Sequence, residues 1–208
     1  NCIAVAPGAN YSLLPGSIIH FSKVIDEADI IVMQAEIPYE TIKRIALLAK
    51  QKGKKVLFNP APACLIDEEL MKAIDILVVN ELEAAFISGI EYTGNNLEEI
   101  ALSLLQAGAR NAVITLGSQG VYMKNDKEII QLPGYKVNAI DTIAAGDTFC
   151  GALAVICAQR EIDRDALSFA NAAAAIAVTR SGAQPSIPTL DEVKHFMLEK
   201  ELALSFNF

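Results

Sequence analysis

Short apolar runs rich in β-branched residues alternate with amphipathic helical segments, and this alternation limits the possible folds more than any other feature. The runs cover residues 30–33, 56–58, 76–79 and 112–116. Strands that are apolar along their whole length are buried on both faces, and helical connections of this length make neighbouring strands parallel. The sequence therefore predicts an α/β fold, a three-layer α/β/α sandwich with a mostly parallel central sheet.

The connecting segments have the spacing of helices. Residues 39–52 place their apolar side chains on one face and stop at Gly53, and residues 97–107 do the same before Gly108. From residue 121 onward, short β segments separated by turns predict an antiparallel edge of the sheet. Helices are then predicted over 146–159 and 164–180, and the capping box from Thr189 to Glu192 predicts the start of a last helix.

No repeat or linker interrupts this pattern, so residues 1–208 are predicted to form one domain. The chain opens with Asn1 rather than Met and leads directly into a strand-like run at residues 2–6. We therefore expect that the start of the protein is missing.

Charge and composition exclude several classes of function. The net charge of −8 and the absence of a Lys/Arg cluster argue against a nucleic-acid surface. No apolar stretch approaches the ~20 residues of a membrane span, and no signal peptide is visible, so a soluble cytoplasmic protein without a membrane partner is expected. The scattered Cys2, Cys64, Cys150 and Cys157 indicate neither a zinc site nor a disulfide framework. An anionic nucleotide would have to be held by backbone amides and helix N-termini.

Residues 141–149 carry the most informative motif, a β-like segment that enters a helix of small residues. A helix that begins at Ala145 and Gly146 would present unpaired N–H groups and the positive end of its dipole to a phosphate. Asp147 in its first turn could accept the proton of an attacking hydroxyl group. An aspartate in a first helical turn is equally compatible with a purely structural role.

Two further motifs also have two interpretations. Residues 115–120 end a strand in a loop with two glycines, which offers backbone donors to a ligand or merely forms a tight turn. Asn80 and Glu83 would share one face of a helix that follows the strand at 76–79, either as functional groups or as an ordinary helix start.

The motif at 141–147 resembles the D-T-x-x-A/G-G-D signature of the ribokinase-type (PfkB) carbohydrate kinase family. Further segments resemble that family in order and spacing, namely residues 1–10, 59–63, 80–83, 115–120 and 171–186. The resemblance implies that Asp147 is the catalytic base and that Ala144, Ala145 and Gly146 form an anion hole with it. It implies nucleotide binding by Asn80, Thr115, Leu116, Gly117, Ser118, Gln119, Gly120, Gly146, Asp147 and Asn171. It also implies sugar binding by Glu36 and Asp147.

The resemblance further implies ATP as a substrate, Mg²⁺ as a cofactor and K⁺ as an activator. Asn80 and Glu83 correspond to a motif that supports magnesium and phosphate binding. The monovalent cation would be held by oxygen atoms of Asp141, Ile143, Ala177, Arg180, Gly182 and Ser186. Residues 181–186 are irregular, which leaves carbonyl groups available, although a loop of this composition needs no ion.

The implied activity is phosphorylation of D-ribose to D-ribose 5-phosphate by ATP. Another sugar or nucleoside kinase of this family, or a non-catalytic nucleotide-binding remnant, is the alternative. The chain resembles the C-terminal two-thirds of such an enzyme, without the N-terminal part that supplies a Gly-Gly sugar motif, most sugar ligands and a β-lid involved in homodimer contacts. Cys150 stands where the family usually has Asn, and we expect this change to tune the activity rather than abolish it.

Overall fold

The computed structural model of the protein describes residues 6–200. The chain divides into two compact units, residues 1–113 and residues 114–208. The boundary falls within a strand, and the single domain predicted from the sequence stays a prediction. The predicted strand at 2–6, apart from residue 6, and the first half of the family-like segment at 1–10 lie outside the described residues.

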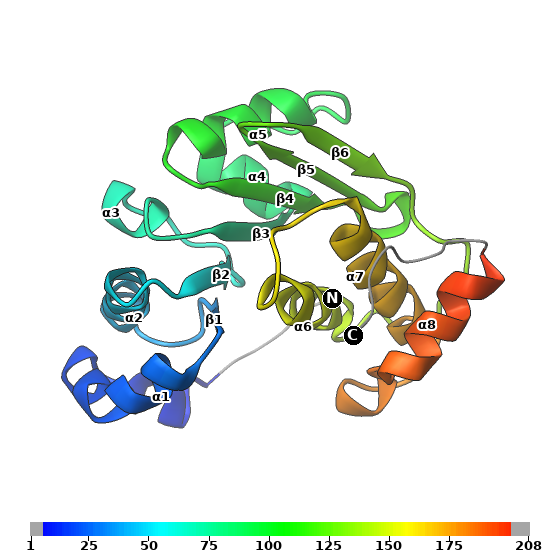
Figure 1. Ribbon diagram of the computed structural model, residues 1–208. Coiled ribbons are helices and arrows are strands. Elements are labelled where there is room, and N and C mark those ends of the chain that lie inside the picture. The colour runs from blue at the N-terminus through cyan, green and yellow to red at the C-terminus, as the bar shows by residue number, and fades with distance from the viewer. Residues whose placement is uncertain (1–5, 201–208) are drawn as a thin grey trace. The chain divides into compact units, whose positions relative to one another are not determined.

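Six strands are hydrogen-bonded in the order of the chain. They are β1 (Ile30–Gln34), β2 (Lys55–Asn59), β3 (Ile76–Asn80), β4 (Asn111–Thr115), β5 (Val121–Asn125) and β6 (Ile129–Leu132). β2 pairs in parallel with both β1 and β3, whereas β5 and β6 are antiparallel. Each apolar run identified in the sequence lies in a strand, apart from Leu116, which follows the end of β4. The α/β fold with a mostly parallel sheet and an antiparallel edge is confirmed (Figure 1).

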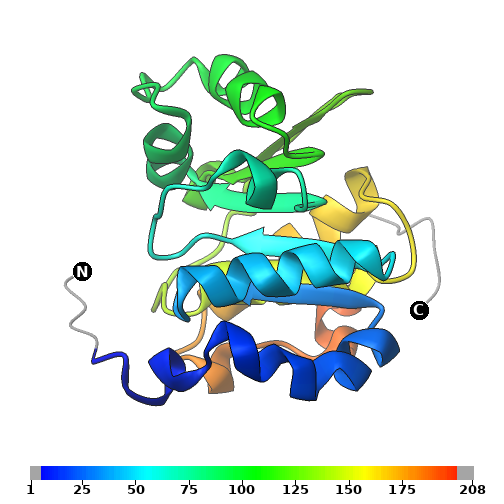
Figure 2. The same ribbon diagram turned by 90° about the vertical axis from the view of Figure 1, so that its left-hand side faces the viewer.

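The two helices predicted from amphipathic spacing, at residues 39–52 and 97–107, are both present in the first unit. The unit contains α1 (Ser22–Glu27), α2 (Tyr39–Gln51), α3 (Glu68–Met71), α4 (Glu81–Ser88) and α5 (Leu97–Gln106), preceded by 3-10 turns at Gly8–Ser12 and Pro15–Phe21. α2 runs across the face of β1 and β2 and buries Ile42, Ala46 and Ala49 there (Figure 2). Full burial of a side chain such as Ile42 contributes about 2 kcal/mol, so the apolar stripe holds α2 on the sheet.

Asp75 fixes the start of the neighbouring strands of the first unit. Its carboxylate accepts hydrogen bonds from Val56 N at 2.9 Å and from Arg110 Nη1 at 2.8 Å. Its carbonyl oxygen accepts a hydrogen bond from Asn111 Nδ2 at 2.8 Å. The residue before β3 is therefore bonded to β2 and to the first residue of β4, which aligns the starts of the three strands.

The second unit is helical after β6. It contains α6 (Ala145–Cys157), α7 (Arg164–Ala177) and α8 (Leu190–Glu199), with 3-10 turns at Gly117–Gln119 and Gln184–Ser186. α7 packs against both α6 and α8 (Figure 1). The predicted capping box is confirmed, because the Thr189 hydroxyl accepts a hydrogen bond from Glu192 N and the Glu192 carboxylate accepts one from Thr189 N. Within residues 6–200, no helix combines the length and apolar character that a membrane crossing requires.

Gly120 and Gly134 allow two loops of the second unit to approach each other closely. A Cβ atom added to Gly120 would lie 2.1 Å from the Leu132 carbonyl oxygen, and one added to Gly134 would lie 2.2 Å from the Ser118 carbonyl oxygen. Gly120 also has a φ of +100°, a conformation that side chains rarely adopt. The loop after β4 and the loop after β6 therefore pack backbone against backbone.

We predict that Gly120→Ala lowers the free energy of unfolding by about 3 kcal/mol, because steric overlap adds to backbone strain. Gly117→Ala is the matched control, since Gly117 also has a positive φ, +54°, but a Cβ atom added there would have no neighbour within 4 Å. The control should cost only about 1 kcal/mol. Urea unfolding of both variants measures the difference, and equal losses would contradict the role of the close approach.

Candidate active site

A cavity of about 500 Å³ lies within the second unit. The polar residues and glycines that line it include six to which the resemblance assigns nucleotide binding, namely Thr115, Gly117, Ser118, Gly120, Gly146 and Asn171. The other four residues of that set do not line it: Leu116 is buried, Gln119 is exposed, Asp147 lines a different cavity and Asn80 belongs to the first unit. Small residues of α7 such as Ala174 and Ala175 complete a largely apolar wall. The structure thus brings together loop, helix-start and helix-face residues around one space large enough for a ligand.

Asn171 holds one wall of this cavity in place. Its side chain is 8% exposed, and Nδ2 donates a hydrogen bond to the Pro133 carbonyl oxygen at 3.0 Å. Within residues 6–200 its amide oxygen accepts no hydrogen bond. One half of the amide therefore has a structural role, and the other half remains available to a hydrogen-bond donor on a ligand.

The start of α6 differs from the starts of the other α-helices in the second unit. α7 and α8 begin with the side-chain caps Asp163 and Thr189, whereas no side chain caps α6. The N-cap of α6 is Ala144 at φ 60° and ψ 10°, and among the described residues it alone combines a side chain with a positive φ. Left-handed backbone at a residue with a side chain is unfavourable and is often found at functional sites. The N-terminal end of the helix, with its positive potential, is therefore left without a side-chain cap.

Asp147 lies in the first turn of α6 and is exposed. It lines a second cavity, of about 300 Å³, whose other walls are mostly apolar side chains of α6, α7 and the segment that leads into α8. Gly146, one residue earlier, lines the larger cavity instead. The start of α6 therefore lies between the two cavities. Gly146 lines the larger cavity and the Asp147 side chain lines the smaller one.

Thr148 is a candidate that the sequence did not indicate. It lines the smaller cavity next to Asp147, and its side-chain oxygen is buried without a hydrogen-bond partner among residues 6–200. Buried hydroxyl groups normally have a partner. A polar group of a bound ligand could supply that partner.

Asp141 is hydrogen-bonded to two of the other residues proposed to hold a monovalent cation. The carboxylate of Asp141 accepts hydrogen bonds from Ile143 N and from Gly182 N, each at 3.0 Å. These bonds, from Ile143 first and Gly182 second, lower the pKa of the carboxyl group below its usual value. Asp141 therefore stays ionised and connects the turn before α6 to the loop after α7.

Carbonyl groups near Asp141 are available to an ion. Within residues 6–200, the carbonyl oxygens of Ile143, Arg180 and Gly182 accept no hydrogen bond, whereas that of Ala177 accepts one from Arg180 N at 3.0 Å. The Ser186 side chain is buried and donates a hydrogen bond to the Ala183 carbonyl oxygen at 2.6 Å. Unpaired carbonyl groups beside a carboxylate are suitable ligands for a cation that prefers oxygen.

Asn80 and Glu83, in the first unit, form a complete capping box at the start of α4. Asn80 Oδ1 accepts hydrogen bonds from Leu82 N at 2.9 Å and from Glu83 N at 2.8 Å, and Glu83 Oε2 accepts one from Asn80 N at 2.9 Å. Burial raises the pKa of Glu83. Because the amide oxygen of Asn80 already accepts two hydrogen bonds, its remaining group is the Nδ2 donor, which suits a phosphate oxygen better than a metal ion.

Glu36 is exposed in the turn that follows β1. That turn is bonded to the family-like segment at 59–63, because Ala35 N donates a hydrogen bond to the Ala61 carbonyl oxygen at 3.1 Å. Glu36, Asn59 and Asn80 each lie at or just beyond the carboxyl end of a strand of the first unit. Open parallel sheets bind ligands at this edge.

Comparison with known proteins agrees with this geometry. The family model described as pfkB family carbohydrate kinase matches residues 2–190, and the chain belongs to this family. A ribokinase of Staphylococcus aureus is 40% identical over 195 residues, which cover 93% of this chain and 64% of that protein. The crystal structure of a Thermotoga maritima ribokinase is also 40% identical, with a TM-score of 0.85 over 95% of this chain and 65% of that one.

A third similar protein is an Arabidopsis thaliana ribokinase solved in complex with ribose and ATP. It is 28% identical and has a TM-score of 0.88, with coverage of 100% of this chain and 66% of that chain. This chain spans slightly less than two thirds of the length of the curated relatives that it matches.

The capping box allows the structural and ligand-binding roles of Asn80 to be separated. We predict that Asn80→Ala lowers the free energy of unfolding by about 1 kcal/mol, because two helix N–H groups lose their acceptor. Asn80→Ser retains a cap but lacks the amide donor, so it should be nearly as stable as the wild type and bind ATP more weakly. Urea unfolding and ATP calorimetry measure the two effects, and wild-type ATP affinity in Asn80→Ser would contradict a ligand role.

Proposed function

We propose that this chain carries the phosphoryl-transfer machinery of an ATP-dependent sugar kinase that converts D-ribose to D-ribose 5-phosphate. The observation that carries this proposal is the start of α6, where an uncapped helix end and the Asp147 carboxylate stand between two cavities. The larger cavity would bind ATP, and the smaller one would face the sugar that accepts the phosphoryl group. The similarity to ribokinases supports ribose as that acceptor.

In the proposed reaction, Asp147 accepts the proton of the primary hydroxyl group of ribose as that oxygen attacks the γ-phosphorus atom of ATP. The bond from phosphorus to the bridging oxygen breaks, and ADP leaves. Backbone amides of Ala144, Ala145, Gly146 and Asp147 stabilise the charge on the transferring group, with help from the helix dipole. Thr115, Gly120 and Asn171 contribute to nucleotide binding in the second unit, and the Asn80 amide is the nucleotide ligand proposed for the first unit.

Mg²⁺ and K⁺ belong to the same proposal. Mg²⁺ is typically held by one or two carboxylates together with substrate phosphates and water, and Glu83, which retains a second carboxylate oxygen, would reach it through water. The Asp141 carboxylate and the unpaired carbonyl groups of Ile143, Arg180 and Gly182 fit a monovalent cation. Such a cation would neutralise negative charge beside the start of α6.

Only part of sugar recognition is assigned to these residues. Glu36 is the proposed sugar ligand of the first unit, and the remaining third of a ribokinase-length protein would supply the others. A cytoplasmic location and, for the full-length enzyme, a homodimer belong to the same proposal. Assaying ribose against other pentoses and nucleosides identifies the acceptor.

The general-base role of Asp147 can be tested in the natural polypeptide that contains these residues. We predict that Asp147→Asn lowers kcat for ribose-dependent ADP formation about a hundredfold to ten-thousandfold, because a general base contributes this much to such reactions. Stability should change by no more than about 1 kcal/mol, since Asn retains the size of the side chain. A coupled assay for ADP measures kcat.

Asp191→Asn serves as the matched control, because Asp191 is also an exposed acid in a first helical turn, that of α8. This variant should keep wild-type activity. If Asp147 is only a structural helix-start residue, the two variants will behave alike, and Asp147→Asn activity within about tenfold of wild type would rule out its role as the base.

A further inference from the structure

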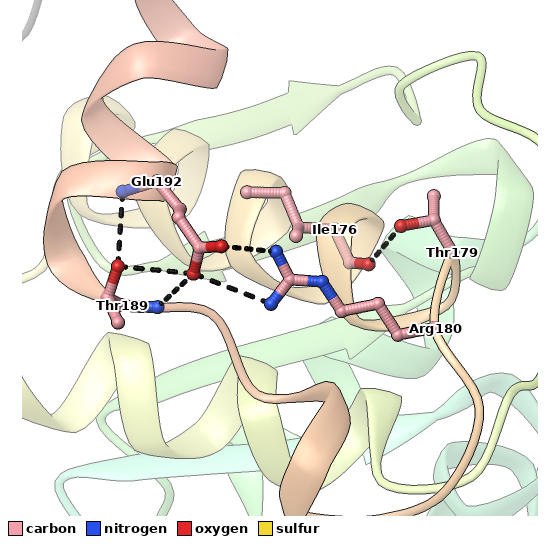
Figure 3. Close-up of polar contacts among 5 residues, drawn as sticks. All are labelled: Ile176, Thr179, Arg180, Thr189 and Glu192. Atoms are coloured by element: carbon pink, nitrogen blue, oxygen red, sulfur yellow. Dashed lines mark hydrogen bonds and ion pairs between the residues drawn. The ribbon is translucent and has the colours of Figure 1, made fainter.

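The carboxylate of Glu192 joins the two ends of the loop at residues 181–188. Glu192 accepts hydrogen bonds from both terminal nitrogens of Arg180, at 2.6 Å from Nη2 to Oε1 and 3.4 Å from Nη1 to Oε2. The same Oε2 atom accepts a hydrogen bond from Thr189 N at 2.7 Å and one from Thr189 Oγ1 at 3.1 Å (Figure 3). Glu192 therefore joins the residue before the loop to the residue after it, and these three residues are called the clasp below.

The inner side of the loop is bonded to the turn that leads into α6. Gly182 N, two residues after Arg180, donates a hydrogen bond to the Asp141 carboxylate, and the other oxygen of that carboxylate accepts one from Ile143 N. Ala144, the left-handed N-cap of α6, follows directly. A continuous series of bonds thus runs from Glu192 through Arg180 and Gly182 to Asp141 and the start of α6.

The clasp contributes more to the orientation of loop 181–188 than to the stability of the fold. The side chains of Arg180 and Glu192 are 33% and 44% exposed, and ion pairs at this level of exposure contribute little to folding. Two parallel contacts from a planar guanidinium group nevertheless fix direction as well as distance. Anchoring the Arg180 side chain therefore restricts the peptide groups that follow it, including the Arg180 carbonyl group and the Gly182 amide.

We infer that Glu192 is a positioning residue for phosphoryl transfer. It acts through Arg180, by holding loop 181–188 so that Gly182 orients the Asp141 carboxylate and with it the turn before α6. The inference rests on the proposed function, because the turn that it positions is the proposed anion hole. It adds a residue of α8 to the groups that determine the rate, although Glu192 contacts neither proposed cavity.

The test uses Glu192→Gln, which keeps the size of the side chain and removes its charge, in the natural polypeptide. Amide hydrogen exchange at Gly182 and Ile143 should become about tenfold faster, because these two amides donate to the carboxylate that the clasp orients. In steady-state assays kcat should fall about tenfold while KM for ATP stays within about twofold. A helix that was merely weakened would instead exchange faster along the whole of α8.

Glu199→Gln is the matched control, since the Glu199 carboxylate lies 3.2 Å from His195 Nε2 on the same helix and takes no part in the clasp. It should leave the exchange of Gly182 and the value of kcat unchanged. Arg180→Lys provides a second variant, which retains the charge and loses the two parallel contacts. It should reproduce part of the effect, and the double variant Arg180→Lys, Glu192→Gln should be no slower than Glu192→Gln alone.

Unchanged exchange at Gly182 and Ile143 in Glu192→Gln would overturn the positioning role, even if the wild-type enzyme is an active kinase. An unchanged kcat would overturn it as well. A wild-type enzyme that transfers no phosphoryl group to any pentose would overturn the proposed function separately, because hydrogen exchange reports on the clasp without turnover.

Discussion

The Asp141 carboxylate is the constraint on which the candidate phosphoryl-transfer site depends. Its two oxygens accept hydrogen bonds from amides that are far apart in the sequence, those of Ile143 and Gly182. Hydrogen bonds to an ionised acceptor are stronger than neutral ones and are sensitive to direction. The turn before α6 and the loop after α7 are consequently held by the same group, and the strained conformation of Ala144 is maintained between fixed neighbours.

Most of the secondary structure could be predicted because it follows from local pattern. Apolar runs of a few residues became β1 to β4, and the stripe of Ile42, Ala46 and Ala49 placed α2 on the sheet. The predicted end positions of the last long helices were less accurate. α7 ends at Ala177 rather than at residue 180, because Thr179 N and Arg180 N donate to carbonyl groups three residues earlier and close the helix with tighter turns.

The candidate site was only partly predictable from local chemistry. An aspartate in the first turn of a helix has the same sequence signature whether it is a base or a structural acid, so the role of Asp147 depended on resemblance to a family. The same ambiguity affects Asn80, which the structure shows as a helix cap with a remaining amide donor. The bonds of Asn171 to Pro133 and of Arg180 to Glu192 were not predicted, because they join residues 38 and 12 positions apart and depend on packing between elements.

The contrast among the helices of the second unit supports the proposal that α6 is the helix that binds a phosphate. A side-chain cap such as Asp163 or Thr189 contributes about 1 kcal/mol by accepting hydrogen bonds from the first N–H groups of its helix. α6 lacks that contribution, and its left-handed Ala144 adds a cost of similar size. A bound anion that accepts those N–H groups would recover the missing stabilisation, so the same local defect that weakens the free protein increases the affinity of the helix start for a phosphoryl group. Asp141 makes this arrangement possible, because its bonds to the flanking backbone hold the helix start in position before any ligand binds.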